Sequence, residues 1–152
     1  MLFLLFQLAR DRYALDVAQV VEVLPLVSIK QIPHTPEAVA GAFNYRGKPV
    51  PAIDLSRLML GRPAQHRLST RIIVVDYPGR AGAKHALGLI AEMVTETVRR
   101  QASDFAASGV TSPDAPYLGP VATDARGLLQ WVQVEHLLPA ALRDLLFTAQ
   151  GS

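Results

Sequence analysis

The chain of 152 residues is half hydrophobic and 18% charged, which excludes disorder and allows one compact domain with a sizeable core. Its net charge of +2 and pI of about 9.2 are mildly basic, and its 15 Lys and Arg residues are spread along the chain, unlike the dense basic face of a nucleic-acid binder. There is no Cys, which excludes disulfides and thiolate metal sites. The apolar start at Met1–Phe6 is too short for a signal core or a membrane span, so we expect a soluble, cytoplasmic protein.

The first part of the chain predicts short strands separated by turns. Leu2 to Leu8 and Tyr13 to Val17 are apolar runs on either side of a polar turn, which is typical of a hairpin. A short helical turn is expected near Ala18, followed by a strand through Val21–Val23 that a proline ends. Val27 to Ile32 alternates apolar and polar residues and predicts a half-buried strand.

A second hairpin is predicted around the turn Arg46-Gly47-Lys48, where glycine permits a positive φ. Residues 34–41 before it predict a short turn of helix with a proline at its first position and Gly41 closing it. Pro49 and Pro51 remove two N–H donors from one side of the returning strand. That strand therefore cannot be central in a sheet at those two points.

Asp54 ends this hairpin and is expected to cap a short helix over residues 55–60. Residues 61–70 are polar and linker-like, and Ile72 to Tyr77 is a continuous apolar strand expected to be buried on both faces. The later elements expected are a strand from His85 to Val94 that can extend to Val98, a long loop over 101–120 with an extended piece near 116–119, strands over 121–125 and 127–134, and an end helix over about 135–147.

The second hairpin and the helix cap form one continuous pattern of spaced residues. The pattern is Gly41-x-x-Asn44-x-Arg46-Gly47-x-x-x-Pro51-x-x-Asp54-Leu55. It resembles the signature of the CheW-like domain, the coupling module of bacterial chemosensory arrays. Further pieces match that family in order and spacing, namely Phe6-Gln-Leu8, Tyr13-Ala-Leu15, Val20-Val-Glu22-Val23 and Ile32-Pro33. The resemblance covers most of residues 3–62 and continues more weakly to about residue 138.

The resemblance implies a mainly β fold of two small five-stranded SH3-like barrels around a shared hydrophobic core, with short helices and a C-terminal helix. We expect a single CheW-like domain over 1–147, with lobes of about 1–62 and 70–139 that can exchange strands, and a tail at 148–152. The many short strands with Gly and Pro turns favour the same class. A weak internal echo, Arg46-Gly47 against Arg126-Gly127, agrees with two similar halves. We expect a free adaptor rather than part of a longer kinase.

No motif of an enzyme is present in the sequence. There is no Gly-x-Ser-x-Gly elbow and no His-Glu-x-x-His, and the four His residues stand alone. The glycines around residues 79–82 lack the Gly-Lys-Ser/Thr of a phosphate-binding loop, and a strand rather than a helix comes after them. We therefore predict no catalysis, no metal and no cofactor.

The resemblance also implies the site and its partners. CheW-like proteins bind chemoreceptor cytoplasmic tips in the groove between the lobes, and bind the regulatory domain of a CheA-type histidine kinase through a lobe end. The protein would be cytoplasmic and recruited to receptor arrays, without insertion into the membrane. Carried over, the receptor-binding residues are Val20, Glu22, Asn44, Arg46 and Gly47, and the structural ones are Gly41, Pro51, Asp54 and Leu55.

Within this site, Val20 and Glu22 are two residues apart on a strand, so we expect them to share a face beside the Arg46 turn. Glu22 is the expected ion-pair partner of Arg46. The sequence departs from the family at Tyr45 and Pro49, where the family usually has Leu and Val or Ile. It also departs at 88–94, where the family has an Asp-Ser-Val-like run. These departures suggest a paralogue tuned to its own receptor and kinase.

A small β-barrel nucleic-acid-binding protein is the alternative, suggested by the pI and a five-stranded barrel. It would need aromatic residues interleaved with Arg and Lys on one sheet face. The ten aromatic residues stand mostly inside apolar runs, which predicts core positions. They are Phe3, Phe6, Tyr13, Phe43, Tyr45, Tyr77, Phe105, Tyr117, Trp131 and Phe147.

Overall fold

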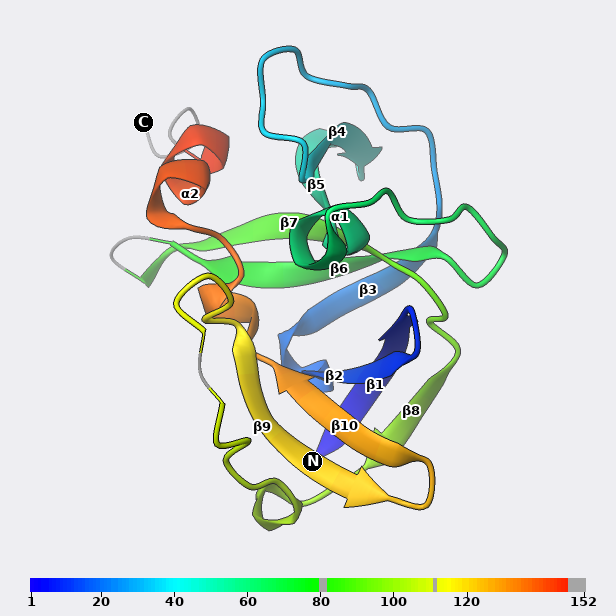
Figure 1. The fold of residues 1–152 in the computed structure, drawn as a ribbon. Coiled ribbons are helices and arrows are strands. Elements are labelled where there is room, and N and C mark those ends of the chain that lie inside the picture. Colours follow the sequence, from blue (N-terminus) through cyan, green and yellow to red (C-terminus); the bar gives the residue numbers. More distant parts are fainter. Residues whose placement is uncertain (80–81, 111, 148–152) are drawn as a thin grey trace.

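The structure is a computed structural model that describes residues 1–79, 82–110 and 112–147. Two five-stranded sheets form the molecule, one above the other in Figure 1. The lower sheet, sheet A, has the strand order β8 (Glu96–Arg99), β1 (Leu2–Leu8), β2 (Asp11–Asp16), β10 (Gly127–Val132) and β9 (Leu118–Asp124). The upper sheet, sheet B, has the order β3 (Val20–Pro25), β6 (Arg71–Pro78), β7 (Lys84–Ala91), β5 (Lys48–Asp54) and β4 (Val39–Tyr45).

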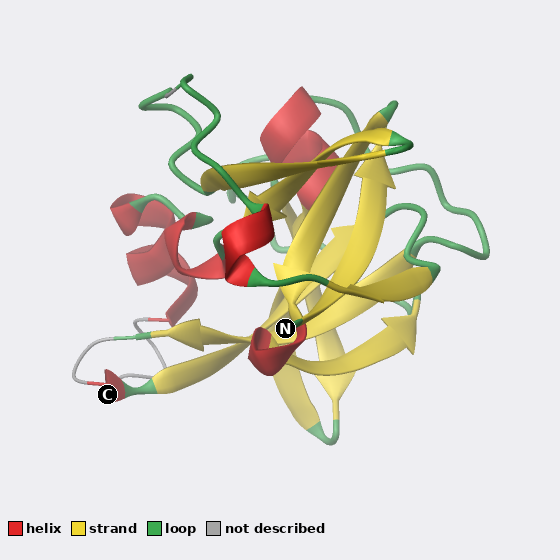
Figure 2. Ribbon diagram, turned by 90° about the horizontal axis from the view of Figure 1, so that it is seen from below, coloured by secondary structure: helices red, strands yellow, loops and turns green. Residues whose placement is uncertain are grey.

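The helical segments are short and lie around the outside of the strands (Figure 2). They are the α-helices α1 (Leu55–Leu60) and α2 (Ala140–Phe147) and the 3₁₀ turns η1 (Val17–Gln19), η3 (Ala102–Asp104) and η4 (Val134–His136). No helix in the described part of the chain is long and apolar enough to cross a membrane.

The strands β1 and β6 are buried on both faces, which explains their continuous apolar runs in the sequence. In β1, Phe3 and Leu5 point into an apolar cluster inside sheet A, while the alternate residues Leu4 and Phe6 join a cluster shared by both sheets. β6 repeats the arrangement in sheet B, because residues 72 and 74 face its own interior and residues 73, 75 and 77 face the shared core. Since successive side chains of a strand alternate between faces, such strands contain no polar side. The predicted mainly β class with a shared core is confirmed.

Each sheet draws strands from both of the predicted lobes, 1–62 and 70–139, which were expected to be able to exchange strands. Residues 2–16 pair with β8 and β10 in sheet A, whereas residues 20–91 build all of sheet B. The N-terminal hairpin thus completes the sheet formed by the C-terminal part. Both sheets use the same plan: the first strand of the order pairs antiparallel with the second, and the third pairs parallel with the fourth.

Sheet B closes on itself through the segment after its edge strand β3. Lys30 exchanges two backbone hydrogen bonds of 2.9 Å with Ala42 on the opposite edge strand, β4. Sheet A closes in the same way, where Ala106, after β8, exchanges hydrogen bonds of 2.8 and 2.9 Å with Val121 on β9. Both sheets therefore approach barrels with few unpaired edges, which limits association through exposed strands.

Two predicted elements before β4 are wrong. The segment over 27–32 makes only the single bridge at Lys30, with Val27 and Ile32 exposed, so it is not a strand. The segment over 34–41 contains isolated turns in place of a helix, and Gly41 lies inside β4. The physical reason is common to both: this stretch must reach across the open side of sheet B, and it does so as extended chain.

Two later elements differ from their predicted bounds. β7 stops at Ala91 and not at Val94, since the chain turns at Met93, whose φ is 53°, and crosses to sheet A as β8. The predicted end helix over 135–147 is interrupted at Pro139, after which α2 begins. Proline has no N–H for a preceding turn of helix, so it separates η4 from α2. The predicted tail at 148–152 lies outside the described residues.

Candidate functional site

The Arg46 turn, residues 44–47, joins β4 to β5 with two successive residues in the left-handed region. Arg46 has a φ of 52° and Gly47 a φ of 83°. Such a pair matches the right-handed twist of the flanking strands, so it gives a tight two-residue hairpin. Asn44 Oδ1 accepts a hydrogen bond of 2.9 Å from the Gly47 N–H and holds the turn closed. The predicted hairpin and its turn are confirmed.

One carboxylate oxygen of Glu22 accepts two hydrogen bonds from this turn. Glu22 Oε1 lies 2.8 Å from Arg46 Nη2 and 2.8 Å from the hydroxyl oxygen of Tyr45. The predicted Glu22–Arg46 ion pair is therefore present, with 73% of the Arg46 side chain and 37% of the Glu22 side chain exposed. The Arg46 guanidinium carbon also lies 5.1 Å from the centroid of the Tyr45 ring. Donation to the Glu22 carboxylate is the main cause that raises the pKa of Tyr45.

These contacts join the two edge strands of sheet B. Glu22 is on β3 and Tyr45 is the last residue of β4, at opposite ends of the strand order. The ion pair therefore sits where the sheet curls round to close, beyond the backbone bridge between Lys30 and Ala42. Glu22 is on β3, and Arg46 directly follows β4. The side chains of this exposed pair are therefore held in orientation by two strands.

The structure corrects the placement of Val20 relative to Glu22. The register of β3 against β6 shifts between them, because Val20 opposes Val75 whereas Glu22 opposes Val74. Val20 therefore shares a face with Val75 and packs against the shared core, and Glu22 is on the other face. The expected alternation fails at this bulge, which adds one residue to β3. The added residue is Val21, which is 47% exposed beside Glu22 and was not singled out from the sequence.

Two of the residues predicted to be structural, Gly41 and Pro51, lie on the strands of the hairpin and fix how those strands pair. Gly41 has a φ of 143°, and a Cβ atom there would lie only 2.0 Å from the carbonyl oxygen of Lys30. Glycine is thus required for the bridge that closes sheet B. Pro51 is buried and opposes Ala42, and β7 pairs with β5 only from Ala52 onward. The prediction that the two prolines keep that part of β5 from a second partner strand is confirmed.

Asp54 ends β5 and anchors both α1 and the segment beyond it. Its Oδ1 accepts hydrogen bonds from the N–H groups of Ser56 at 3.0 Å and Arg57 at 3.3 Å, which confirms the predicted cap of α1. Its Oδ2 accepts a further bond of 3.0 Å from the N–H of Ala64, so the linker-like segment after the helix is tied down at one point. Leu55, the first helical residue, is fully buried in the shared core.

Sheet A carries a counterpart, the Arg126 turn of residues 124–127 between β9 and β10. Arg126 Nη2 lies 2.7 Å from Glu96 on the edge strand β8. Asp124 accepts two hydrogen bonds, of 2.6 and 3.1 Å, from the buried guanidinium of Arg12, and a third of 3.2 Å from Arg100. The Arg12 hydrogen bonds are the main cause that lowers the pKa of Asp124 to about 2.

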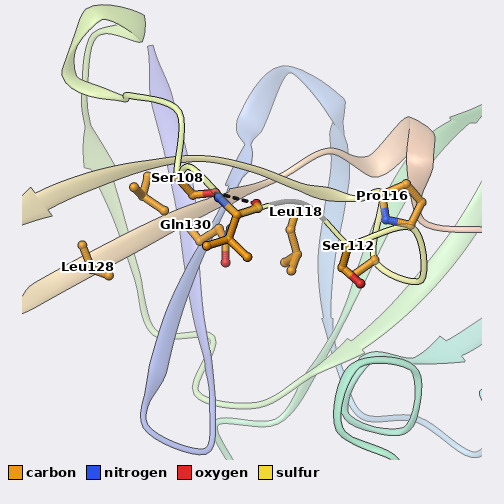
Figure 3. A pocket seen from close by; sticks show the side chains of 9 residues that line it. Ser108, Ser112, Pro116, Leu118, Leu128 and Gln130 are labelled. Carbon is orange, nitrogen blue, oxygen red and sulfur yellow. Dashed lines mark hydrogen bonds between the residues drawn. The ribbon is translucent and has the colours of Figure 1, made fainter.

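A surface cavity of about 440 Å³ lies on sheet A, along β9 and β10 (Figure 3). Leu118, Leu128 and Val110 supply much of its apolar lining, and Ser108, Ser112 and Gln130 supply uncharged polar groups. None of the described residues that line it has a titratable side chain. Among the described residues there is also no group of three or more His, Asp or Glu side chains placed to hold a metal ion.

The fold and the Arg46 turn define a module of two five-stranded sheets with an exposed ion pair at the tip of one hairpin. A model of the CheW-like domain matches residues 2–142. The chain is 29% identical to the chemotaxis protein CheW of Klebsiella aerogenes over 142 residues, 90% of this chain and 80% of that one. It is 29% identical to the chemotaxis protein CheW of Helicobacter pylori over 104 residues, 68% of this chain and 59% of that one.

A solved structure agrees with these matches. The scaffolding protein TtCheW of Thermoanaerobacter tengcongensis has a TM-score of 0.79 and 30% identity, with 93% of this chain and 89% of that chain covered. The chain belongs to the CheW-like domain family, and is a chemotaxis coupling adaptor of that type. The resemblance inferred from the hairpin pattern is confirmed.

Proposed function

We propose that this chain is a non-catalytic adaptor that binds chemoreceptor cytoplasmic tips and the regulatory domain of a CheA-type histidine kinase. It works in the cytoplasm and is recruited to receptor arrays. The observation that carries the proposal is the Glu22–Tyr45–Arg46 cluster, a charged group that is exposed yet held by two strands of sheet B. Most of the Arg46 side chain is exposed in the described structure, so its guanidinium can face another protein.

The receptor-facing residues in this proposal are those of the turn and its partner strand. Arg46 and Glu22 present opposite charges, and Asn44 and Gly47 set the turn geometry. Val20 lies on the other face of β3 from Glu22, so its proposed apolar contact is made only through the part of its side chain that is not buried. Exposed charges of this kind contribute little to stability, about 0–1 kcal/mol for the pair. Their value lies in choosing and orienting the partner, and in speeding the encounter.

The aromatic residues give no support to a nucleic-acid-binding surface. Eight of the ten are buried in the described structure, and Tyr45 and Trp131 are half-buried. Stacking with unpaired bases requires exposed rings next to basic side chains. The coupling role is therefore the one that the arrangement favours.

The test is a pull-down with a purified receptor tip fragment and a purified kinase regulatory domain. Wild type is compared with Arg46→Ala and Glu22→Ala, with circular dichroism as the control for folding. We expect wild type to capture both partners, and each variant to lose the receptor fragment while it keeps the kinase domain. A wild-type protein that captures neither partner would contradict the proposal.

A further inference from the structure

We propose that Tyr45 is a positioning residue that orients Arg46 and Glu22 for docking and thereby sets the affinity of the Arg46 turn. The part of the proposal that concerns affinity rests on the proposed function, because it requires that the Arg46 turn binds a chemoreceptor tip. The structural part, the ordering of Arg46 by Tyr45, is independent of any partner. Tyr45 occupies the position before Arg46-Gly47 where this sequence departs from the family pattern.

Tyr45 touches both members of the ion pair. Its hydroxyl donates to the same Glu22 oxygen that accepts from Arg46, at 2.8 Å in each case. Its ring lies beneath the guanidinium of Arg46, with 5.1 Å between the guanidinium carbon and the ring centroid. A cation over the face of an aromatic ring is attracted by the ring's quadrupole. Arg46 is therefore confined from two directions, by the Tyr45 ring and by the Glu22 carboxylate that the Tyr45 hydroxyl holds.

Tyr45 is itself anchored. Its ring packs against the apolar cluster inside sheet B, and its centroid is 6.3 Å from that of the buried Phe43. The phenol reaches outward from this anchor with its hydroxyl on Glu22. Few rotatable bonds separate the hydroxyl from the core, so ordering it costs little further side-chain entropy.

Without Tyr45, the Glu22–Arg46 pair would be an ordinary surface ion pair. Its side chains are 37% and 73% exposed, and pairs of that kind are readily screened and rearranged by water. With Tyr45, the carboxylate is held before a partner arrives. Binding then loses less conformational freedom, which is how pre-organisation increases affinity. Among the described residues Arg46 donates only to Glu22, through Nη2, so its other N–H groups can serve the partner.

The experiment compares Tyr45→Phe, which removes only the hydroxyl, with Tyr45→Leu, which also removes the ring. Tyr117→Phe is the matched control, because Tyr117 is a buried tyrosine of the other lobe. Affinity for the receptor tip fragment is measured by calorimetry. We expect Tyr45→Phe to weaken binding about threefold to tenfold and Tyr45→Leu to weaken it further, while Tyr117→Phe binds like wild type.

A double-mutant cycle separates positioning from a general structural effect. In a Glu22→Gln background the hydroxyl has lost its charged acceptor, so Tyr45→Phe should change the affinity less than about twofold. In parallel, nuclear magnetic resonance of the free protein records the Arg46 side-chain signals. We expect a distinct Arg46 guanidinium signal in wild type and an averaged one in Tyr45→Phe.

The experiments distinguish a failure of this proposal from a failure of the proposed function. If wild type does not bind the receptor fragment, the function fails and the Arg46 signals alone decide the role of Tyr45. Averaging in Tyr45→Phe supports that role. Arg46 signals that are the same in wild type and Tyr45→Phe would overturn it, as would equal effects of Tyr45→Phe in the wild-type and Glu22→Gln backgrounds.

Discussion

Each sheet has a hairpin with an Arg-Gly pair at its turn, in two different settings. In sheet B, Arg46 pairs with Glu22 across the opening of the sheet at 2.8 Å, and in sheet A, Arg126 pairs with Glu96 at 2.7 Å. A side chain at the start of each turn accepts a backbone N–H, Asn44 from Gly47 and Asp124 from Arg126. The weak internal echo in the sequence thus corresponds to two hairpins with similar ion pairs, although the turns differ: Arg46 has a φ of 52°, whereas Arg126 is not in the left-handed region.

The two turns differ in the contacts of their first residue, Asp124 in sheet A and Asn44 in sheet B. Asp124 is held by Arg12, of which only 7% is exposed, and by Arg100. Asn44 is an exposed amide whose hydrogen bond is local to the turn. The Arg126 turn is thus locked into sheet A by buried charge, whereas the Arg46 turn depends on Tyr45 and Glu22 at the surface. We therefore propose that the Arg126 turn serves stability and that the Arg46 turn presents a surface.

The largest expected effect comes from Gly41→Ala, which should break the closure of sheet B. The new Cβ would lie 2.0 Å from the Lys30 carbonyl oxygen, and alanine is strained at a φ of 143°. We expect a loss of about 3–4 kcal/mol in the free energy of unfolding, measured by urea denaturation. Gly47→Ala is the control, because it is strained at a φ of 83° but meets open space, and should cost only about 1–2 kcal/mol. Equal losses would show that the contact with Lys30 is unimportant.

The next largest effect should come from the locked turn, through Asp124→Ala. It leaves the buried Arg12 guanidinium with only the Gly127 carbonyl oxygen as an acceptor among the described residues. Because Asp124 is partly exposed, we expect a loss of about 2–3 kcal/mol in the free energy of unfolding, below the range for fully buried pairs. Asn44→Ala, the matching change in the other turn, should cost about 1 kcal/mol or less. Similar losses at both positions would contradict the proposed difference between the turns.

The same carboxylate predicts a pH dependence. The pKa of Asp124 is lowered in the folded protein from 3.8 to about 2, mainly by the Arg12 hydrogen bonds. A lowered folded-state pKa stabilises the protein above the unfolded-state value, and this contribution is lost as the pH falls from about 4 towards 2. The difference in unfolding free energy between wild type and Asp124→Asn should therefore be constant above about pH 5 and shrink below about pH 4. A difference that does not change down to about pH 2 would rule out this cause.

Local signals in the sequence were sufficient for much of this fold. Asp54 before a short apolar helix, glycine in the Arg46 turn and the apolar run over 72–77 each define their element without help from distant residues. The failures involve contacts between distant parts of the chain. The segment over 27–32 alternates like a strand, yet within it only Lys30 forms a β-bridge, to a strand that begins nine residues later.

The candidate site shows the same limit. Glu22 and Arg46 could be paired in advance through the family resemblance, but the bulge at Val21 reverses the face of Val20, and a period of two cannot reveal a bulge. The Tyr45 hydroxyl bond to Glu22 spans 23 residues and depends on the closing of sheet B. The sequence marks Tyr45 only as one of the aromatic residues expected in the core and as an expected departure from the family pattern, and neither predicts its bond to Glu22.

A smaller effect on stability is expected from Glu22→Gln. The pair it weakens is exposed, so the free energy of unfolding should fall by less than about 1 kcal/mol in chemical denaturation. The affinity for a receptor tip fragment should fall much more, and its dependence on salt should weaken, because a charge is removed from the docking surface. A loss of stability as large as that of Asp124→Ala would assign Glu22 a structural role.

The most direct test of the comparison uses Arg46→Ala and Arg126→Ala side by side. Both remove an exposed arginine from a hairpin turn and break one ion pair, so each should change the unfolding free energy by less than about 1 kcal/mol. Titration of a receptor tip fragment should then separate them, with binding lost in Arg46→Ala and kept in Arg126→Ala. If Arg126→Ala loses the fragment as Arg46→Ala does, or Arg46→Ala binds it like wild type, the account of the two turns is wrong.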